Sequence, residues 1–381
     1  MKKGSKGLVF AAGALALVLG VALADVLTPA QSGPAQTEAA AKTAGEAFKN
    51  IQVLKDIPAD ELIPSMEFIS SSLGVHCSFC HEEGDFSKDT KHPKLRARQM
   101  MTMQLAIDKE NFGGRPEVTC NTCHRGSTHP VSVPTVGEQA ASATPGEAMS
   151  SGNANGSTMP TADQVLAKYV EALGGMAAIQ KITTRVEKGT MTDQGGHSMP
   201  IEITYKTPDQ RVVTVQTPRG EMTIASGPTG AWQSMGGRTQ PIGGPELAGM
   251  RVASRLDFPA QAQQLYGQLR VGHPAKVDGA DSYVLFGFGH GNPPAELYFD
   301  QQSGLLLREV IFAQTPLGRL ADQTDFSDYR ETDGVKTPYQ LVNSSARGTS
   351  TVHFEQVQQN VSVPDSKFAK PAAPAQNPPS Q

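Results

Sequence analysis

Apolar residues recur at helical spacing in two stretches near the start of the chain. Residues 63–73 carry an apolar face and stop at Gly74, and a glycine just past the last helical residue commonly ends a helix. Residues 93 to about 109 repeat the pattern, because Leu105 follows Met101 by four residues and Pro93 suits a first helical turn. We therefore predict two helices, each followed by a turn or loop.

The pattern changes after residue 160. Thr161 and Gln164 form a capping box, which predicts a helix over 161–173. The next segments alternate apolar and polar residues and predict a mostly antiparallel sheet. These segments are TRVEKGTM, IEITYKT, RVVTVQT, EMTIAS, SYVLFGF, AELYFD, LLLREVIF and STVHFEQV. One helical stretch, 259–269, is expected to interrupt the strands.

The length of 381 residues suggests two domains joined by linkers. The prediction divides the chain into a flexible tether (25–47), a small mostly-α domain (48–133), a linker (134–160), an antiparallel β domain (161–370) and a disordered tail (371–381). The net charge of −4 is too small to indicate a nucleic-acid partner.

The first 24 residues have the pattern of an export signal. Three lysines precede an apolar run from residue 8 to 24, and Ala22-Leu23-Ala24 matches a cleavage site. The alternative is an uncleaved anchor, because the run is near the lower limit of a membrane span. We expect a periplasmic protein, either soluble or anchored once at its N-terminus.

Two short motifs contain every cysteine of the chain. CSFCH places Cys77 and Cys80 before His81, and CNTCH places Cys120 and Cys123 before His124. Cys-x-x-Cys-His is the attachment motif of haem c. Two thiols at this spacing can add to the two vinyl groups on one porphyrin edge, and the histidine that follows can then bind the iron. The motifs predict two covalently bound haem c groups.

Other chemistries use paired cysteines. Two zinc ligand pairs, two disulfides or a thioredoxin-like redox pair are the alternatives. None of them gives a reason for a histidine after each pair, and the gap between the motifs is long for a zinc ribbon. We therefore favour haem.

Each haem iron also needs a sixth ligand or an open position. Met66 lies on the helix before the first motif, and Met100, Met101 and Met103 lie on the helix before the second. A methionine ligand would raise the reduction potential of a low-spin iron. Spacing alone does not choose between Met100 and Met103, which share a face, and methionine is also a common core filler.

The stretch from MEFISSSLGVHCSFCH through ARQMMTM to FGGRPEVTCNTCHRG resembles the tetrahaem cytochrome subunit of photosynthetic reaction centres. It is most similar to two-haem, single-half relatives, over about 50–133. The resemblance implies a dihaem cytochrome c domain, with Met66 as distal ligand for the first haem and Met100 for the second. The chain departs from that family in carrying two motifs and not four. It also has no histidine at 111–118, so both irons are expected to be His/Met.

The second half contains no recognisable catalytic or nucleotide-binding motif. Its pattern resembles the periplasmic outer-membrane lipoprotein-carrier superfamily, which implies a half-barrel sheet with helices over its mouth. Members hold hydrophobic ligands in the concave face. The alternative is a docking module that has kept the fold without the ligand.

The other histidines are interpreted as ordinary residues. His76 directly precedes Cys77, so its geometry for the same iron is poor, and His92 and His129 are expected in solvent-facing loops. No metal is assigned to the remaining four, since none has a carboxylate or histidine at ligand spacing; these are His197, His273, His290 and His353. Arg125 is either a partner for a haem propionate or a plain surface residue.

Together these patterns predict an exported dihaem cytochrome that transfers electrons between a redox donor and an acceptor. It is not expected to be an enzyme. The alternatives are a lipid or quinone carrier coupled to a redox haem domain, and a dihaem peroxidase-type enzyme, which would need an open iron position.

Overall fold

The computed structural model describes residues 42–130 and 159–371. The predicted export signal lies outside the described residues. So do most of the predicted tether, nearly all of the linker and all of the tail after residue 371. In the described ranges no helix has both the length and the apolar content that crossing a membrane requires.

Residues 42–130 are helical. Helix α1 (Ala44–Ala47) falls within the predicted tether, and a 3₁₀ turn (Ala59–Glu61) leads into α2 (Leu62–Leu73). Gly74 ends α2 in the left-handed conformation, with φ 64°. The predicted helix at 63–73 and its glycine terminator are therefore confirmed.

The second predicted helix is also confirmed and is longer than expected. Helix α4 (His92–Phe112) has Pro93 in its first turn and ends at Gly113, again with a positive φ. The two cysteine motifs form short helices of their own, α3 (Cys77–Cys80) and α5 (Cys120–His124). Each follows a long helix after a connection, as predicted.

Residues 159–371 begin with α7 (Ala162–Leu173), and α8 (Met176–Ile179) follows. Thr161 caps α7, because its hydroxyl accepts from the Gln164 backbone N–H at 3.2 Å and the Gln164 side chain accepts from the Thr161 N–H at 2.8 Å. The predicted capping box is confirmed.

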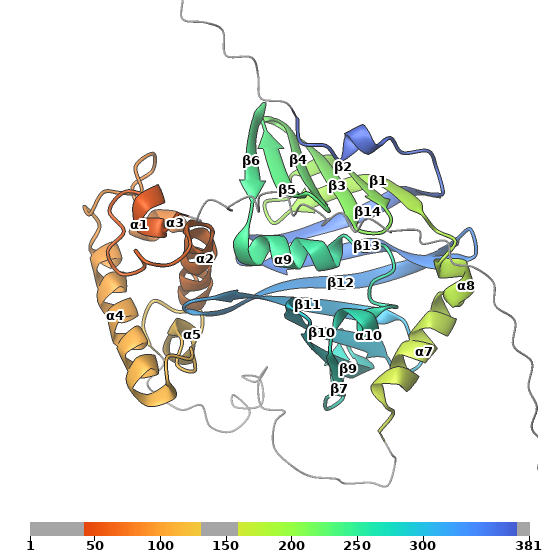
Figure 1. Ribbon diagram of the computed structural model, residues 1–381, viewed down its shortest axis with the longest axis horizontal. Helices are drawn as coiled ribbons and strands as arrows, with labels where there is room; N and C mark the ends of the chain where they lie inside the picture. Colours follow the sequence, from red (N-terminus) through yellow and green to blue (C-terminus); the bar gives the residue numbers. More distant parts are fainter. Residues whose placement is uncertain (1–41, 131–158, 372–381) are drawn as a thin grey trace, which may run out of the picture. The chain divides into compact units, whose positions relative to one another are not determined.

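A single 14-stranded sheet makes up most of this part (Figure 1). Its hydrogen-bonded order is β6-β5-β4-β3-β2-β1-β14-β13-β12-β11-β10-β9-β7, with β8 also paired to β9, and neighbouring strands are antiparallel. The strands are β1 (Thr184–Asp193), β2 (Ser198–Lys206), β3 (Gln210–Thr217), β4 (Gly220–Gly227), β5 (Gly230–Met235), β6 (Arg238–Ile242), β7 (Gln268–Val271), β8 (Ala275–Val277), β9 (Ala280–Gly289), β10 (Asn292–Asp300), β11 (Leu306–Thr315), β12 (Gly318–Thr332), β13 (Val335–Ser345) and β14 (Gly348–Gln359). The predicted antiparallel sheet is confirmed.

The predicted helix at 259–269 is largely wrong. Only α10 (Ala262–Leu265) is helical there, and β7 starts at Gln268. Tyr266 is 1% exposed and packs on Gly287, where an added Cβ would meet its ring at 2.7 Å. This packing and the pairing of β7 with β9 override the local helical pattern.

Another helix, α9 (Gly244–Ala253), was not predicted. It contains two glycines, which weaken a helical pattern in sequence, and its one proline lies in the first turn. Its burial against the sheet explains why it forms, since Val252 is 1% exposed. Figure 1 shows α9 lying across the strands, with α7 against the same sheet.

The largest hydrophobic core lies between α7 and strands β9–β11. Four residues of α7 are buried in it: Val165, Leu166, Tyr169 and Leu173. They meet buried strand residues such as Leu285, Leu297 and Phe299. A short 3₁₀ turn (Asp365–Lys367) near the end of the described chain brings Phe368 against the Trp232 side of the sheet.

The helical part has a much smaller core, and one of its members comes from the sheet. Leu317, at the turn between β11 and β12, is 0% exposed and packs with Leu62, Phe68 and Met101. The buried side chain of Gln104 donates to the Leu317 carbonyl at 3.1 Å. The β11–β12 turn therefore completes the core of the helical part.

Candidate functional site

The first cysteine motif forms one helical turn. Cys77 and Cys80 stand three residues apart on α3, so their side chains point to the same side. Neither is in a disulfide, and both are at least partly exposed. Burial raises the pKa of the Cys80 thiol, and the nearby Lys91 opposes this change.

His81 follows directly at the end of α3. Its ring atom Nδ1 lies 2.9 Å from the Phe86 carbonyl oxygen. A carbonyl only accepts hydrogen bonds, so this contact requires the proton to be on Nδ1. The lone pair of Nε2 is then available to a metal, an arrangement that is usual for histidine ligands.

Lys94 holds the loop that contains this carbonyl. Its ammonium group donates to the carbonyl oxygens of Phe86 at 2.9 Å, Ser87 at 3.0 Å and Lys88 at 2.7 Å, and pairs with Asp89 at 3.0 Å. Lys94 is 8% exposed, which is rare for a lysine. The sequence analysis did not identify this positioning residue, since a lysine on a helix gives no such signal.

The second motif repeats the arrangement. The Thr119 and Thr122 side chains cap the start of α5, and the His124 Nδ1 atom lies 2.9 Å from the Ser127 carbonyl oxygen. Nε2 of His124 is therefore also left as the acceptor atom. Asp108 fixes the preceding loop by accepting from the Val118 N–H at 2.9 Å.

Cys120 has a buried hydrogen-bond partner. Its Sγ donates to Oε1 of Gln104 at 3.3 Å, and the same amide binds the Leu317 carbonyl. Burial raises the pKa of the Cys120 thiol to about 11, so the neutral thiol predominates at neutral pH. The partner Cys123 is exposed.

The two motif units pack against each other. The Gly126 N–H donates to the Ser72 carbonyl at 2.9 Å, and a Cβ on Gly74 would lie 2.3 Å from the Gly126 oxygen. Helix α2 thus packs against α5 of the second unit, and α3 of the first unit packs against α4. The Gly126 carbonyl leaves no room for a side chain at position 74, whereas Gly126 itself has open space and is favoured by its left-handed φ of 81°.

The structure separates the candidate methionines by burial. Met101 is 7% exposed and belongs to the small core, which is the core-filling role. Met66 and Met100 are half-buried, whereas Met103 is 49% exposed. Met101 is therefore a core residue, and the choice between Met100 and Met103 stays open.

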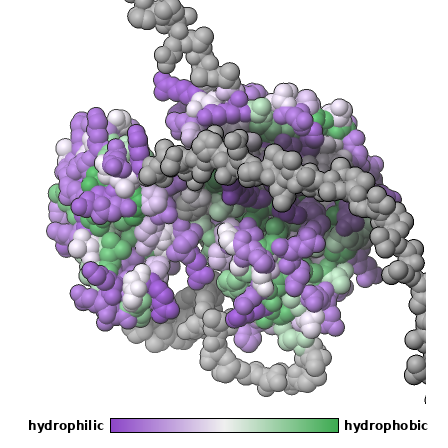
Figure 2. All heavy atoms as spheres, in the orientation of Figure 1, coloured by the Kyte–Doolittle hydropathy of each residue, from purple (hydrophilic) through white to green (hydrophobic). Residues whose placement is uncertain are grey.

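The helical part exposes many large apolar side chains. Six of the eight large hydrophobic residues that are exposed in the described ranges lie in 42–130: Phe48, Ile63, Phe79, Phe86, Leu95 and Met103. Figure 2 shows hydrophobic residues at the surface of this part, among hydrophilic ones. Phe79 stands inside the first motif. Reduced thiols, histidines with an available Nε2 and nearby apolar side chains together fit a covalently attached haem.

The histidines outside the motifs follow the predictions in part. His92 and His129 are exposed as predicted, but His92 begins helix α4 and does not lie in a loop. His197 was expected to have no carboxylate at ligand spacing, and this was wrong: its Nδ1 lies 3.1 Å from Asp193 Oδ2 across the β1–β2 turn. The turn brings residues four apart together, which strand spacing alone does not suggest. Still, in 42–130 and 159–371 no three His, Cys, Asp or Glu side chains form a metal-binding group.

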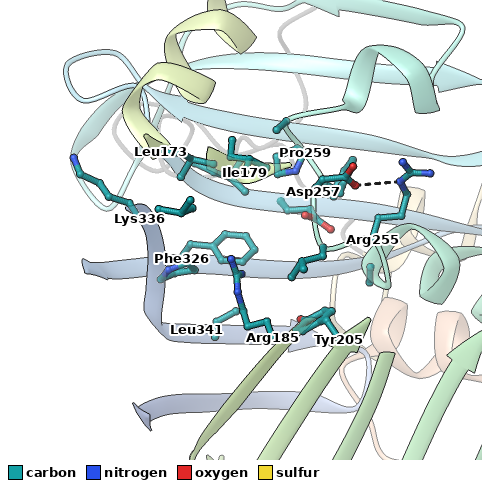
Figure 3. A pocket seen from close by; sticks show the side chains of 18 of the residues that line it. Leu173, Ile179, Arg185, Tyr205, Arg255, Asp257, Pro259, Phe326, Lys336 and Leu341 are labelled. Carbon is teal, nitrogen blue, oxygen red and sulfur yellow. Dashed lines mark ion pairs between the residues drawn. The ribbon is translucent and has the colours of Figure 1, made fainter. Parts of the chain in front are cut away.

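The sheet contains a second candidate site that the sequence analysis missed. A cavity of about 190 Å³ lies over β1–β3 and β11–β13 and under residues 253–260 (Figure 3). Charged side chains line it, although the sequence resemblance implied a hydrophobic site. Arg185, Tyr205 and Arg211 are direct cross-strand neighbours on β1, β2 and β3. Only the strand register brings these three residues together.

A family model described as "Photosynthetic reaction centre cytochrome C subunit" matches residues 1–204. The reaction centre cytochrome c subunit of Thermochromatium tepidum is 32% identical over 106 residues, which are 27% of this chain and 26% of that protein. Cytochrome c-554 of Chloroflexus aurantiacus is 31% identical over 81 residues, or 20% of each chain. The chain thus spans only about a fifth to a quarter of the length of these relatives.

Solved structures resemble the sheet part. An outer membrane lipoprotein-sorting protein domain from Vibrio parahaemolyticus covers 54% of this chain and 94% of its own, with 12% identity and a TM-score of 0.38. A LolA superfamily protein from Nitrosomonas europaea covers 56% of this chain and 99% of its own, with 17% identity and a TM-score of 0.37.

Proposed function

The chain belongs to the photosynthetic reaction centre cytochrome c subunit family, and we propose that it is a dihaem cytochrome that transfers electrons outside the cytosol. Family membership implies covalently bound haem c. The proposal adds that there are two haems, one on each Cys-x-x-Cys-His motif. It also includes the predicted division into a cytochrome domain at 48–133 and a β domain at 161–370, and export by residues 1–24.

One observation carries the proposal. In both motifs two cysteines lie on one helical turn and the next histidine directs Nδ1 to a backbone carbonyl at 2.9 Å. Zinc or disulfide formation would not require this histidine geometry twice. The repeated arrangement supports axial ligation through Nε2 of His81 and His124.

The residues of each unit have separate roles in this proposal. Cys77 and Cys80 hold one haem, and Cys120 and Cys123 hold the other. When bound, haem c supplies an iron that gains and loses one electron. The histidines are the proximal ligands, and their carbonyl partners fix the ring orientation. No substrate group has to be bound or transformed, so the proposed activity is electron transfer and not catalysis.

Mass spectrometry of the chain matured in a host with c-type haem assembly tests the haem count. The unmodified chain is expected to gain two haem masses. The double variants Cys77→Ser/Cys80→Ser and Cys120→Ser/Cys123→Ser should each keep one, whereas His129→Ala should keep both. A chain that gains no haem, beside a control cytochrome that does, would contradict the proposal and favour zinc or disulfides.

Met66 and Met100 are proposed as the distal ligands. Replacing either with leucine should remove the sulfur-to-iron absorption of one haem and lower its potential, because thioether ligation raises the potential. Met103→Leu is the matched control, since it lies on the same helix face as Met100. If the Met103 variant loses this absorption and the Met100 variant keeps it, the second assignment is wrong.

Two other functions are less well supported. A peroxidase-type enzyme needs an open iron position, and a high-spin ferric spectrum of the native protein would favour it. A carrier of lipids or quinones needs a large apolar pocket, usually about 300–1,000 Å³ for drug-sized ligands. The cavity in the sheet has about 190 Å³ and several charged side chains. A second hollow of about 620 Å³ beside the start of α7 is large enough, but polar and charged side chains such as Gln164, Lys168 and Asp300 line part of it.

A further inference from the structure

The cavity over the concave side of the sheet is lined unevenly with charge. Four cationic side chains face it: Arg185, Arg211, Arg255 and Lys336. Three acidic side chains also face it: Glu187, Glu309 and Asp257. Two ion pairs form among them, Arg185 with Glu187 at 3.6 Å and Arg255 with Asp257 at 3.4 Å. In Figure 3 the second pair lies on the segment that closes the cavity.

Arg211 has no acidic partner comparable to these pairs. Its guanidinium lies 5.5 Å from the centre of the Tyr205 ring, which holds the group in place. Among the described residues, no group accepts a hydrogen bond from Nε of Arg211 or Nε of Arg185. Both side chains are largely removed from bulk water. Partly buried guanidinium groups with unused donors favour binding an anion.

Glu309 lies on β11, on the other side of the cavity. Burial and the Asp322 carboxylate raise its pKa to about 8, and Arg211 opposes this change. At neutral pH this side chain is therefore mostly neutral and does not balance Arg211. The cavity then carries a net positive charge, because its four cations outnumber the two remaining carboxyl groups, Glu187 and Asp257.

The remaining walls are apolar. Phe326 and Leu341 lie beside Arg185 in Figure 3, and Ile179 and Leu173 lie farther along the cavity. The volume of about 190 Å³ is slightly larger than an engineered cavity of about 150 Å³ that binds benzene. A ligand that fills this space has about the size of one substituted ring.

We propose that this cavity binds a small organic monocarboxylate with a compact apolar body. The carboxylate lies against Arg185 and Arg211, and the body contacts Phe326 and Leu341. An inorganic anion would leave the apolar walls without a partner, and a neutral apolar molecule would leave the guanidinium groups without one. The site lies in the sheet and does not require haem attachment.

Calorimetric titration of the full haem-bearing chain with benzoate tests this proposal. One benzoate per chain should bind, with an unchanged haem spectrum and an affinity about tenfold or more above that of benzyl alcohol, which has the same ring without the charge. Arg211→Gln should weaken benzoate binding about tenfold, by loss of a charge-assisted contact. Arg238→Gln on the exposed strand β6 is the matched control and should bind as the unmodified chain does.

Three results would overturn the proposal. Benzoate could fail to bind, it could bind no more tightly than benzyl alcohol, or inorganic phosphate could displace it at equal concentration. The comparison of benzoate with benzyl alcohol uses only the unmodified chain, so it decides the matter even if Arg211→Gln does not fold. The haem count by mass spectrometry is a separate measurement and does not depend on these results.

Discussion

The buried ammonium group of Lys94 connects helix α4 to the loop at 86–88 and, through the Phe86 carbonyl, to His81. Three carbonyl oxygens and Asp89 surround it. The side chains of Arg98, Asn50 and Lys94 hold the pKa of Asp89 well below its usual range. One cation therefore bridges four acceptors of this segment, three of which also have another partner: the Phe86 carbonyl meets His81, the Ser87 carbonyl accepts from Asn50, and Asp89 pairs with Arg98.

We expect Lys94→Met to lower the free energy of unfolding by about 3 kcal/mol, because it removes three charge-assisted hydrogen bonds and a partly buried ion pair and leaves the Lys88 carbonyl without the donor it has in the folded chain. Chemical denaturation followed by circular dichroism measures this. Lys88→Met, an exposed lysine in the same loop, should change stability by less than about 0.5 kcal/mol. Equal effects of the two substitutions would refute the role given to Lys94.

The raised pKa of Glu309 predicts that the folded chain loses stability as the pH rises. Its folded pKa, about 8, is above the ordinary value of 4.5, so the folded chain holds a proton that the unfolded chain releases between these values. The stabilising contribution of protonated Glu309 to the free energy of unfolding is complete below about pH 4.5. It is lost as the pH rises toward 8. Glu309→Gln should therefore reduce the fall in stability over this range by up to about 1 kcal/mol per pH unit.

Thermal unfolding at several pH values would show this slope. Glu331→Gln, an exposed glutamate on β12, is the control and should leave the slope unchanged. A Glu309→Gln chain with the same slope as the unmodified chain would show that Glu309 titrates normally.

Among the elements of the helical part, the end of α2 is sterically restricted in two ways. Gly74 has a φ of 64°, and a side chain there would overlap the Gly126 carbonyl. We expect Gly74→Ala to cost more than about 2 kcal/mol of stability, because it adds a steric clash to the backbone strain. Gly84→Ala isolates the strain alone, since Gly84 has a φ of 83° and no atom within 4 Å of its added Cβ.

Chemical denaturation of the two variants measures their free energies of unfolding, which can then be compared. If Gly74→Ala costs no more than Gly84→Ala, the close packing of the two motif units is not a significant source of stability.

The helices with clear end signals were predictable from sequence, and those without them were not. Gly74 and the Thr161–Gln164 box give the ends of α2 and α7 directly. Helix α9 has a first-turn proline but no capping box and no terminal glycine, and it forms because the sheet buries Val252. The 259–269 stretch has a helical pattern, but Tyr266 and the β7–β9 pairing force most of it out of that conformation.

At the scale of the whole molecule, the two candidate sites differ in how far apart in the sequence their residues lie. The cysteine motifs are contiguous, so their chemistry could be predicted without a structure. The cavity combines Arg185 and Arg211 with Glu309, which lies about a hundred positions later in the chain and faces them only because the sheet curves. No local pattern marks such residues, and a single sequence does not reveal strand register over that distance.

We expect His124→Ala to unfold much of the helical part while the sheet part stays folded. The helical core is small, and the bulk of a covalently attached haem is the proposed remainder. Far-ultraviolet circular dichroism should show a reduced helix signal, and His129→Ala should not change it. An unchanged signal and melting temperature in His124→Ala would mean that this part folds without its second haem.

The β11–β12 turn makes the helical part and the sheet depend on each other in sequence. Leu317 completes the helical core, and its carbonyl accepts a hydrogen bond from the buried Gln104 side chain of α4. A chain shortened to residues 42–130 would lack Leu317 in its core. A chain shortened to the sheet would expose Leu317 to solvent. Insertions and deletions that alter this turn are therefore constrained by its packing on residues 42–130 as well as by the sheet.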